Sequence, residues 1–198
     1  MFVVTADQRA SRTHEDLVPG ALAALEPIVR GRVALPPERT TGDELQFATE
    51  DADAVMDVCL RLTREGAWSI GVGVGSIESP LPHETRAGRG AAFIHARDAV
   101  ERAKSAPGRL AVTSGDPEAA GDVEALIQLL IDLRDRRSVQ GWELADLLAD
   151  AMTQRQAAVR LGITESAVSR RAGAAGLRTE EAAIPALARA LRRLDGGA

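Results

Sequence analysis

The stretch from Thr153 to Ala172 constrains the fold more than any other part of the sequence. Thr153 and Gln156 have the spacing of a capping box, in which the hydroxyl accepts from an early amide and the glutamine reaches back. Gly162 stands where a left-handed residue would end the first helix, and Thr164 is suited to cap a second one. The segment therefore predicts two short helices joined by a tight turn.

Three apolar positions indicate which kind of helix pair this is. Ala158 is small where two helices would cross, Ile163 would fill the core beside the turn, and Val168 would point inward from the second helix. The run from Thr153 to Ser169 resembles the helix-turn-helix of sigma-factor-like and other bacterial regulators, which bind DNA. An ordinary helical hairpin with a glycine turn is the alternative.

The charge distribution favours a nucleic-acid partner at this end of the chain. The whole chain has a net charge of −5, whereas residues 151–198 carry eight basic and four acidic residues, a local charge of +4. A basic module on an acidic body is expected when only one end meets phosphate. A solvated basic helix would give the same excess.

A helix-turn-helix predicts which side chains contact DNA. The outward face at the start of the second helix would enter the major groove, and it carries Thr164, Glu165, Ser166, Ser169 and Arg170. Arg170 is the best candidate for a bidentate contact to guanine. Gln154, Arg155 and Arg171 are better placed for phosphates, although Arg171 occupies a position that is often apolar in such motifs.

Upstream of this segment, strands and helices alternate. Period-two and helical spacings predict elements at Phe2–Ala6, Leu17–Val29, Val33–Arg39, Glu44–Thr49, Ala52–Glu65, Trp68–Ile77, Gly90–Lys104 and Leu110–Thr113. The order β-α-β-β-α-β-α-β is a ferredoxin-like plan with an added helix and strand. Alternating glycine and valine at Gly71–Gly75 would leave one sheet face open to a closely approaching helix or ligand.

The second half reads as helical throughout. A linker is expected over Ser114–Gly121, followed by helices over Val123–Leu133, Trp142–Met152 and Ile184–Leu194, besides the two at Thr153–Ala172. The first of these has a wide apolar stripe, which suits either a buried helix or a dimer interface. We therefore predict an α+β protein, with a ferredoxin-like domain over residues 1–115 and an all-α domain containing the helix-turn-helix over residues 116–198.

The turn Thr41-Gly42-Asp43-Glu44-Leu45-Gln46 resembles the Gly-Gly-Asp-Glu-Phe hairpin of diguanylate cyclases and the related hairpin of class III nucleotide cyclases. In those palm-type folds a second aspartate ends the first strand, and Asp7 occupies that place here. The resemblance implies that Asp7 and Asp43 face each other and could hold Mg²⁺ against a triphosphate. The alternative is that Asp43-Glu44 is a turn with a solvated acid, and that Asp7 caps a strand end.

The whole pattern resembles the SatD family, small bacterial proteins with a palm-like domain and a DNA-binding tail. The matching segments are Ala6-Asp7, Ser11-Arg12, Gly42–Gln46, the strand at Ile70–Gly75 and the C-terminal helix-turn-helix. The chain departs from the cyclase signature, because Thr41 replaces its first glycine and Leu45 its phenylalanine. We expect no lysine near the two aspartates to neutralise a triphosphate, so Arg9, Arg12 and Arg39 are the basic residues that could do so.

Several other features limit the function. The single Cys59 permits no internal disulfide, fits a reducing cytosol and has the apolar neighbours of a buried structural thiol. No apolar run approaches the roughly 18 residues of a membrane span, and the start lacks a signal-peptide pattern. We expect a cytoplasmic DNA-binding regulator that binds double-stranded DNA as a homodimer, without a membrane or assigned catalytic residues. Its palm-like domain would sense a ligand or mediate dimerisation. The alternative is a Mg²⁺-dependent nucleotide-binding protein or nucleotidyl cyclase with a DNA-binding tail.

Overall fold

The computed structural model describes residues 1–196 and shows an α+β protein with a five-stranded mixed sheet. Its contacts divide the chain into two units. The sheet unit comprises residues 1–128 together with the described residues from 185 onward, and the helical unit comprises residues 129–184. Helices α4 (Pro117–Asp135) and α8 (Leu177–Leu194) contribute residues to both units. No helix in the described part of the chain is long and apolar enough to cross a membrane.

The sheet has the strand order β2-β3-β1-β4-β5. Its strands are β1 (Phe2–Gln8), β2 (Leu35–Arg39), β3 (Glu44–Thr49), β4 (Trp68–Val74) and β5 (Leu110–Thr113). Strand β1 runs antiparallel to both β3 and β4, and β2 runs antiparallel to β3. Strands β4 and β5 are parallel, as expected for two strands joined by a helical crossover.

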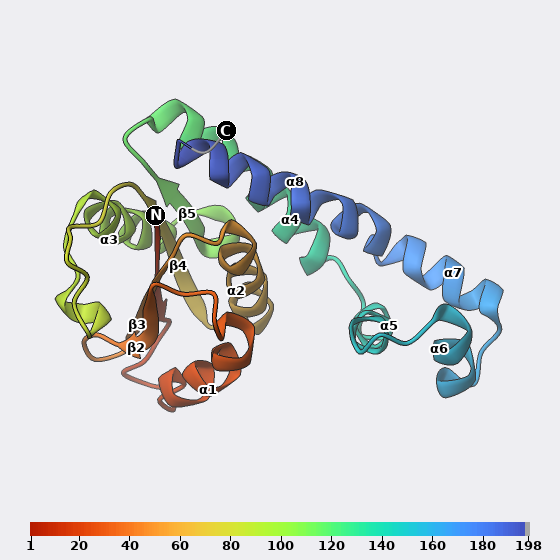
Figure 1. Ribbon diagram of the computed structural model, residues 1–198. Coiled ribbons are helices and arrows are strands. Elements are labelled where there is room, and N and C mark those ends of the chain that lie inside the picture. The colour runs from red at the N-terminus through yellow and green to blue at the C-terminus, as the bar shows by residue number, and fades with distance from the viewer. Residues whose placement is uncertain (197–198) are drawn as a thin grey trace. The chain divides into compact units, whose positions relative to one another are not determined.

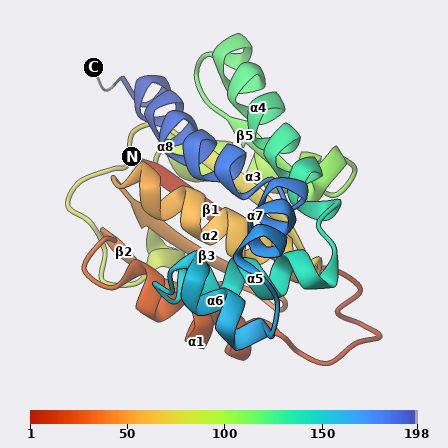
Figure 2. The same cartoon turned by 90° about the vertical axis from the view of Figure 1, so that its right-hand side faces the viewer.

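Helices cover both faces of this sheet. Helices α1 (Val18–Val29) and α2 (Ala52–Glu65) lie on one face, and α3 (Ala91–Ala103) lies on the other (Figure 1). In the view of Figure 2, α2 lies in front of the strands. Short 3₁₀ helices at Thr85–Ala87 and Pro107–Arg109 flank α3 in sequence. The predicted order of strands and helices through β5 is confirmed.

Glycines on β4 determine how closely α3 approaches the sheet. A Cβ atom added to Gly71 would lie 2.2 Å from the backbone nitrogen of Val100, and one added to Gly73 would lie 2.2 Å from backbone atoms of Ala92 and Ala96. Both glycines therefore lie against the backbone of α3. The close approach predicted for this strand is confirmed, and its partner is a helix.

Two strand ends differ from the predictions. Strand β1 continues to Gln8, so Asp7 lies within the strand rather than in a loop, because it is paired with Glu44 on one side and Ser69 on the other. Strand β4 ends at Val74 rather than Ile77. Val74 is opposite Phe2, the first residue of β1, and the amide of the next residue, Gly75, donates to the carbonyl oxygen of Met1 at 3.1 Å.

The linker expected over Ser114–Gly121 is wrong, because α4 begins at Pro117. Asp116 caps this helix by accepting from the amide of Ala119 at 3.0 Å, and the Ser114 hydroxyl accepts from the amide of Asp116 at 3.1 Å. Proline is well tolerated in the first turn, where its missing N–H has no helical partner anyway. The proline and the aspartate therefore start a helix here.

The helical unit is built around the pair of short helices predicted from the sequence. It contains α5 (Val139–Ala149), α6 (Gln154–Leu161) and α7 (Glu165–Ala174). Their common core consists of Leu144, Ala157, Ala158, Val168 and Ala172, with Ile163 and Leu161 packed against it. Ala158, Ile163 and Val168 therefore have the packing roles that their sizes predicted.

The last helix is longer than predicted, since α8 begins at Leu177 rather than Ile184. From Pro185 onward it belongs to the sheet unit, whereas the predicted division placed all of residues 116–198 in one domain. Leu187, Ala188 and Leu191 are buried, and Arg192 forms an ion pair with Asp53 of α2 at 2.8 Å. These contacts attach the end of α8 to the sheet unit.

Candidate functional site

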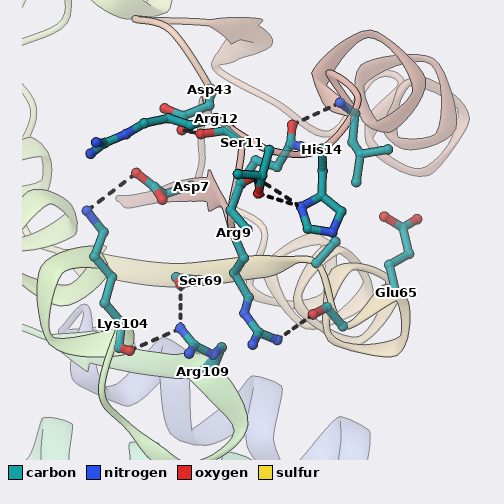
Figure 3. Close-up of a pocket in the computed structure, with 16 residues that line it drawn as sticks. Asp7, Arg9, Ser11, Arg12, His14, Asp43, Glu65, Ser69, Lys104 and Arg109 are labelled. Carbon is teal, nitrogen blue, oxygen red and sulfur yellow. Dashed lines mark hydrogen bonds and ion pairs between the residues drawn. The ribbon is translucent and has the colours of Figure 1, made fainter.

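An open pocket of about 960 Å³ lies at the end of β1 in the sheet unit (Figure 3). It is lined by residues from β1 and the loop after it, from the β2–β3 turn, from the end of α2 through the start of β4, from the end of α3 and from the 3₁₀ helix after α3. The lining residues are Asp7, Gln8, Arg9, Ala10, Ser11, Arg12, Thr13, His14, Leu17, Asp43, Glu65, Gly66, Ala67, Ser69, Lys104 and Arg109. Asp7 and Asp43, the two aspartates singled out from the sequence, are both among them.

Asp7 points from β1 toward the end of α3, as Figure 3 shows. Its Oδ2 atom lies 3.4 Å from the Nζ atom of Lys104. Partial burial raises the pKa of Asp7 above its usual value, the Lys104 ammonium lowers it, and the charges of Asp43 and Glu101 raise it further. The Asp7 carboxylate therefore lies among like charges and is balanced by one nearby lysine.

Asp43 is positioned by the turn between β2 and β3. Gly42 has a φ of +56°, a conformation that glycine adopts readily, and the Asp43 carbonyl accepts from the amide of Gln8 at 3.0 Å. This bond joins the turn to the end of β1. The Ser11 hydroxyl donates to the Asp43 carboxylate, so the loop after β1 is tied to the same aspartate. The two aspartates thus come from adjacent strand ends, as the sequence predicted.

Glu44 has a different role from the solvated acid considered for this turn. Its side chain is only 9% exposed, accepts from the Thr40 hydroxyl at 2.6 Å and pairs with Arg97 of α3 at 2.8 Å. As the register partner of Asp7, it lies on the face of the sheet that α3 covers. Glu44 therefore connects the hairpin to α3 and does not line the pocket.

The basic side chains of the pocket differ in part from the prediction. Arg9 and Arg12 line it as expected, whereas Arg39 pairs with Asp16 at 2.5 Å and is not a lining residue. The expectation that no lysine is near the aspartates is wrong, because folding brings Lys104 to Asp7 from the end of α3. Arg109 also lines the pocket, from the 3₁₀ helix that follows α3. Arg109 donates to the carbonyl oxygen of Lys104 at 3.0 Å and to the Ser69 hydroxyl at 3.4 Å.

The donor set of the pocket is compatible with Mg²⁺ bound together with a phosphate ligand. Within residues 1–196, no group of three or more His, Cys, Asp or Glu side chains is arranged to hold a metal ion by itself. Mg²⁺ commonly binds through one or two carboxylates, with water and substrate phosphates completing its shell. Asp7 and Asp43 would supply those carboxylates, and the basic side chains could contact phosphate.

The helical unit contains the second candidate site, formed by α6, the turn after it and α7 (Figure 1). Both bonds of the capping box at Thr153 and Gln156 are present, and Gly162 ends α6 with a φ of +64°. The Thr164 hydroxyl accepts from the amide of Ala167 at 3.2 Å and so caps α7. The local geometry is therefore the one predicted from these residues.

The side chains proposed to face DNA lie mostly on the surface. The exposed ones are Gln154, Arg155, Thr164, Glu165, Ser166, Ser169 and Arg170. Because Val168 and Ala172 of α7 are buried, Ser166, Ser169 and Arg170 form the outward face of that helix. No described residue forms an ion pair with Arg170. Arg170 can therefore contact an external partner without losing an internal one.

Two of the arginines proposed to contact phosphate already have partners. Arg171 is only 24% exposed and pairs with Glu143 of α5 at 3.4 Å, which explains a charged residue at a position that is often apolar. Arg155 lies 3.9 Å from Glu165, and both side chains are largely exposed. Such exposed pairs contribute little to stability and separate easily. Arg155 thus remains available to a phosphate, whereas Arg171 also supports the packing of α7.

Sequence reasoning missed Ser11, Lys104 and Arg109 as members of the pocket. Ser11 was noted only as part of a family resemblance, and its bond to Asp43 depends on the path of the loop after β1. Lys104 is the only lysine among the 24 basic residues of the chain, which singles it out but does not indicate where it lies. Only the packing of α3 against β4 brings it to Asp7.

Comparison with known proteins adds no relative from which a role could be transferred: no family model, curated protein or solved structure matches this chain significantly.

Proposed function

We propose that this protein is a DNA-binding transcriptional regulator in which α6 and α7 form a helix-turn-helix and α7 enters the major groove. The observation that carries the proposal is the outward face of α7. It begins at a capped N-terminus, carries Ser166, Ser169 and Arg170, and rests on a buried core formed with α5 and α6. Recognition helices of this class contact bases with the same N-terminal part.

The charge around these two helices supports this proposal. Between residues 153 and 178 the chain carries five arginines and one acidic residue, Glu165. Only Arg171 among these arginines is partly buried, so the others can approach phosphates. Neutralising phosphates releases condensed counterions, which supplies most of the affinity for any DNA sequence. Serine and arginine on α7 would then add the sequence-dependent part.

The proposal is tested by comparing two arginine variants on two duplexes. A specific duplex is first selected from a random pool of double-stranded DNA by repeated binding to the full chain. Arg170→Ala should weaken binding to this duplex by about 1–3 kcal/mol and leave binding to random DNA nearly unchanged. Arg155→Ala should weaken binding to both duplexes alike and reduce the salt dependence by about one ion.

Arg30→Ala is the matched control, because it removes one exposed arginine of the sheet unit, whose ion pair with Glu26 lies within α1 and its end. It should leave both affinities within about a factor of two, since rim charges of this kind contribute little. Equal losses for the Arg170 and Arg155 variants on the two duplexes would refute the role of α7 in reading bases.

We propose further that the sheet unit is a ferredoxin-like, palm-like domain of the kind that the SatD resemblance implies. The order β2-β3-β1-β4, with α1 and α2 on one face, supports this, and α3 and β5 are the expected additions. In this regulator the domain would sense a ligand or mediate dimerisation. A dimer interface on α4 is supported by Leu126, an apolar side chain of this helix that is 50% exposed. Leu126→Glu should halve the mass measured by light scattering if α4 forms this interface.

The second candidate function is Mg²⁺-dependent binding of a nucleotide, and the pocket with Asp7, Asp43, Lys104 and Arg109 favours it. The aspartates would hold the cation and the basic side chains would contact phosphate. Bound Mg²⁺ would neutralise phosphate charge, whereas the chain itself would orient the ligand. The Asp7→Ala, Asp43→Ala double variant should lose Mg²⁺-dependent nucleotide binding in calorimetry. Unchanged binding would make the pocket a scaffold without this role.

A further inference from the structure

Lys104 lies at the C-terminal end of α3, between two carboxylates. Its Nζ atom is 3.0 Å from Oε1 of Glu101 and 3.4 Å from Oδ2 of Asp7 (Figure 3). Asp43 also lies close enough for its charge to act on Asp7. Three carboxylates therefore surround this edge of the pocket, and the Lys104 ammonium is the cation that lies between two of them.

The backbone and the side chain of Lys104 are held differently. Its carbonyl oxygen accepts from Arg109 at 3.0 Å, which fixes the backbone at the end of α3. The side chain is 41% exposed and is bound only through its terminal ammonium. A flexible four-carbon stem with one mobile charge can leave its partners more easily than the planar fork of an arginine. The ammonium can therefore swing out of the pocket without moving α3.

We propose that Lys104 is the resident counter-ion of Asp7, and that a divalent cation entering the pocket displaces its ammonium from that carboxylate. This inference rests on the nucleotide-binding candidate above and concerns how its cation site is regulated. The reason is electrostatic, because an ammonium and a divalent cation on one carboxylate oxygen repel each other. In the absence of a divalent cation, Lys104 balances the charge of Asp7 and competes with weakly bound ions for that carboxylate.

The competing explanation is that the ion pair only holds α3 against the sheet. Arg97 provides the comparison, because it lies on the same helix, is exposed and pairs with Glu44 rather than with a pocket carboxylate. If the ion pair is purely structural, removing the Lys104 side chain or the Arg97 side chain should change cation binding by a similar amount. Competition for Asp7 predicts that only removal of Lys104 strengthens cation binding.

The first experiment measures binding of Mn²⁺ to the full chain with inorganic phosphate present, using the electron paramagnetic resonance signal of the free ion. Lys104→Met should bind Mn²⁺ about fivefold more tightly than the unmodified chain, as expected from removing a partly exposed competing charge. Arg97→Met should bind as the unmodified chain does, and Asp7→Asn should lose binding. The fluorescence of Trp68, a buried residue of β4, verifies that each variant is folded when it is measured in a Trp142→Phe background.

The outcomes separate the inference from the function on which it rests. If Asp7→Asn abolishes Mn²⁺ binding while Lys104→Met and Arg97→Met bind like the unmodified chain, the counter-ion role is overturned and the cation site stands. If Asp7→Asn leaves binding unchanged, both the site and the inference fail. If Lys104→Met and Arg97→Met bind Mn²⁺ more tightly by the same factor, the inference is also overturned, because the loss of any positive charge on α3 would then explain the effect.

The second experiment uses the fact that Lys104 is the only lysine in the chain. Acylation by an N-hydroxysuccinimide ester, located by peptide mass mapping, reports on this side chain directly. Saturating Mg²⁺ should increase the acylation rate of Lys104 severalfold, because the displaced amine leaves Asp7 for solvent. The N-terminal amine, which pairs with Asp195, serves as the internal reference. An unchanged ratio of the two rates under saturating Mg²⁺ overturns the proposal.

Discussion

Replacing Gly73 with alanine tests the packing that positions α3 and, with it, one side of the pocket. The new Cβ atom would lie 2.2 Å from the carbonyl oxygen of Ala92 and from the amide nitrogen of Ala96. Both are backbone atoms in consecutive turns of α3, so no side-chain rotation can relieve the clash. Real Cβ atoms essentially never approach other atoms closer than 3.0 Å, so α3 must withdraw by at least the difference.

The cost follows from the rigidity of a packed helix. Overpacking a core typically costs about 1–3 kcal/mol, and a clash between backbone atoms belongs at the upper end, at about 3 kcal/mol. With a urea dependence of about 2 kcal/mol per molar, the midpoint of unfolding of the sheet unit should fall by about 1.5 M. The withdrawal of α3 would also move Lys104 away from Asp7.

Urea unfolding followed by the fluorescence of Trp68 measures this cost. Trp142 belongs to the helical unit, so a Trp142→Phe background leaves Trp68 as the only reporter, and its unit is the one perturbed. Gly121→Ala is the matched control, because Gly121 lies inside α4 with no atom within 4 Å of the added Cβ. Alanine should stabilise that helix by about 0.5–1 kcal/mol.

The reasoning is refuted if Gly73→Ala loses less than about 0.5 kcal/mol, the scale of an ordinary surface substitution. Such a result would mean that α3 can shift freely over β4. A loss of similar size in Gly121→Ala would refute it as well, because the effect would then not depend on contact with α3.

Three further predictions concern other parts of the chain. Gly162→Ala should destabilise the helical unit by about 1–2 kcal/mol in thermal unfolding, because φ is +64° at this position and the added Cβ meets no other atom. Gly162→Asn should lose less stability than Gly162→Ala, and equal losses of stability would contradict a backbone origin. The hydrogen bond from Arg32 lowers the pKa of Asp51. The contribution of this pair to the free energy of unfolding is therefore complete above the usual carboxylate range and disappears as the pH falls through the lowered pKa. Asp51→Asn should therefore be less stable than the unmodified chain at pH 7 by at most about 1 kcal/mol, because the pair is about one-third exposed. This difference in stability should shrink as the pH falls through the lowered pKa, and a difference that stays constant with falling pH would contradict the ion-pair origin. Burial raises the pKa of Cys59 to about 12, so the folded chain should resist a disulfide reagent at pH 8 until denaturant is added, and rapid labelling without denaturant would be the contrary result.

Interactions between residues close in sequence determined the helix caps and the tight turn of the helical unit. The capping box at Thr153, the left-handed Gly162 and the cap at Thr164 involve residues a few positions apart, so their geometry was predictable from spacing alone. The alternating glycines of β4 likewise predicted a close neighbour. Prediction was wrong for the linker before α4, where Asp116 and Pro117 were taken as a break although they are also a favourable helix start.

Only the tertiary structure decided which distant residues meet. Lys104 reaches Asp7 across almost a hundred positions, because α3 packs on Gly71 and Gly73 and ends beside β1. The end of α8 belongs to the sheet unit because of contacts with residues distant in sequence, which no local sequence pattern predicts. Spacing along the chain specifies dihedral angles and caps, whereas ion pairs and pockets depend on how whole elements pack. The sequence by itself therefore determined the turn between α6 and α7 and indicated the two aspartates, whereas the fold decided that Lys104 lies beside Asp7.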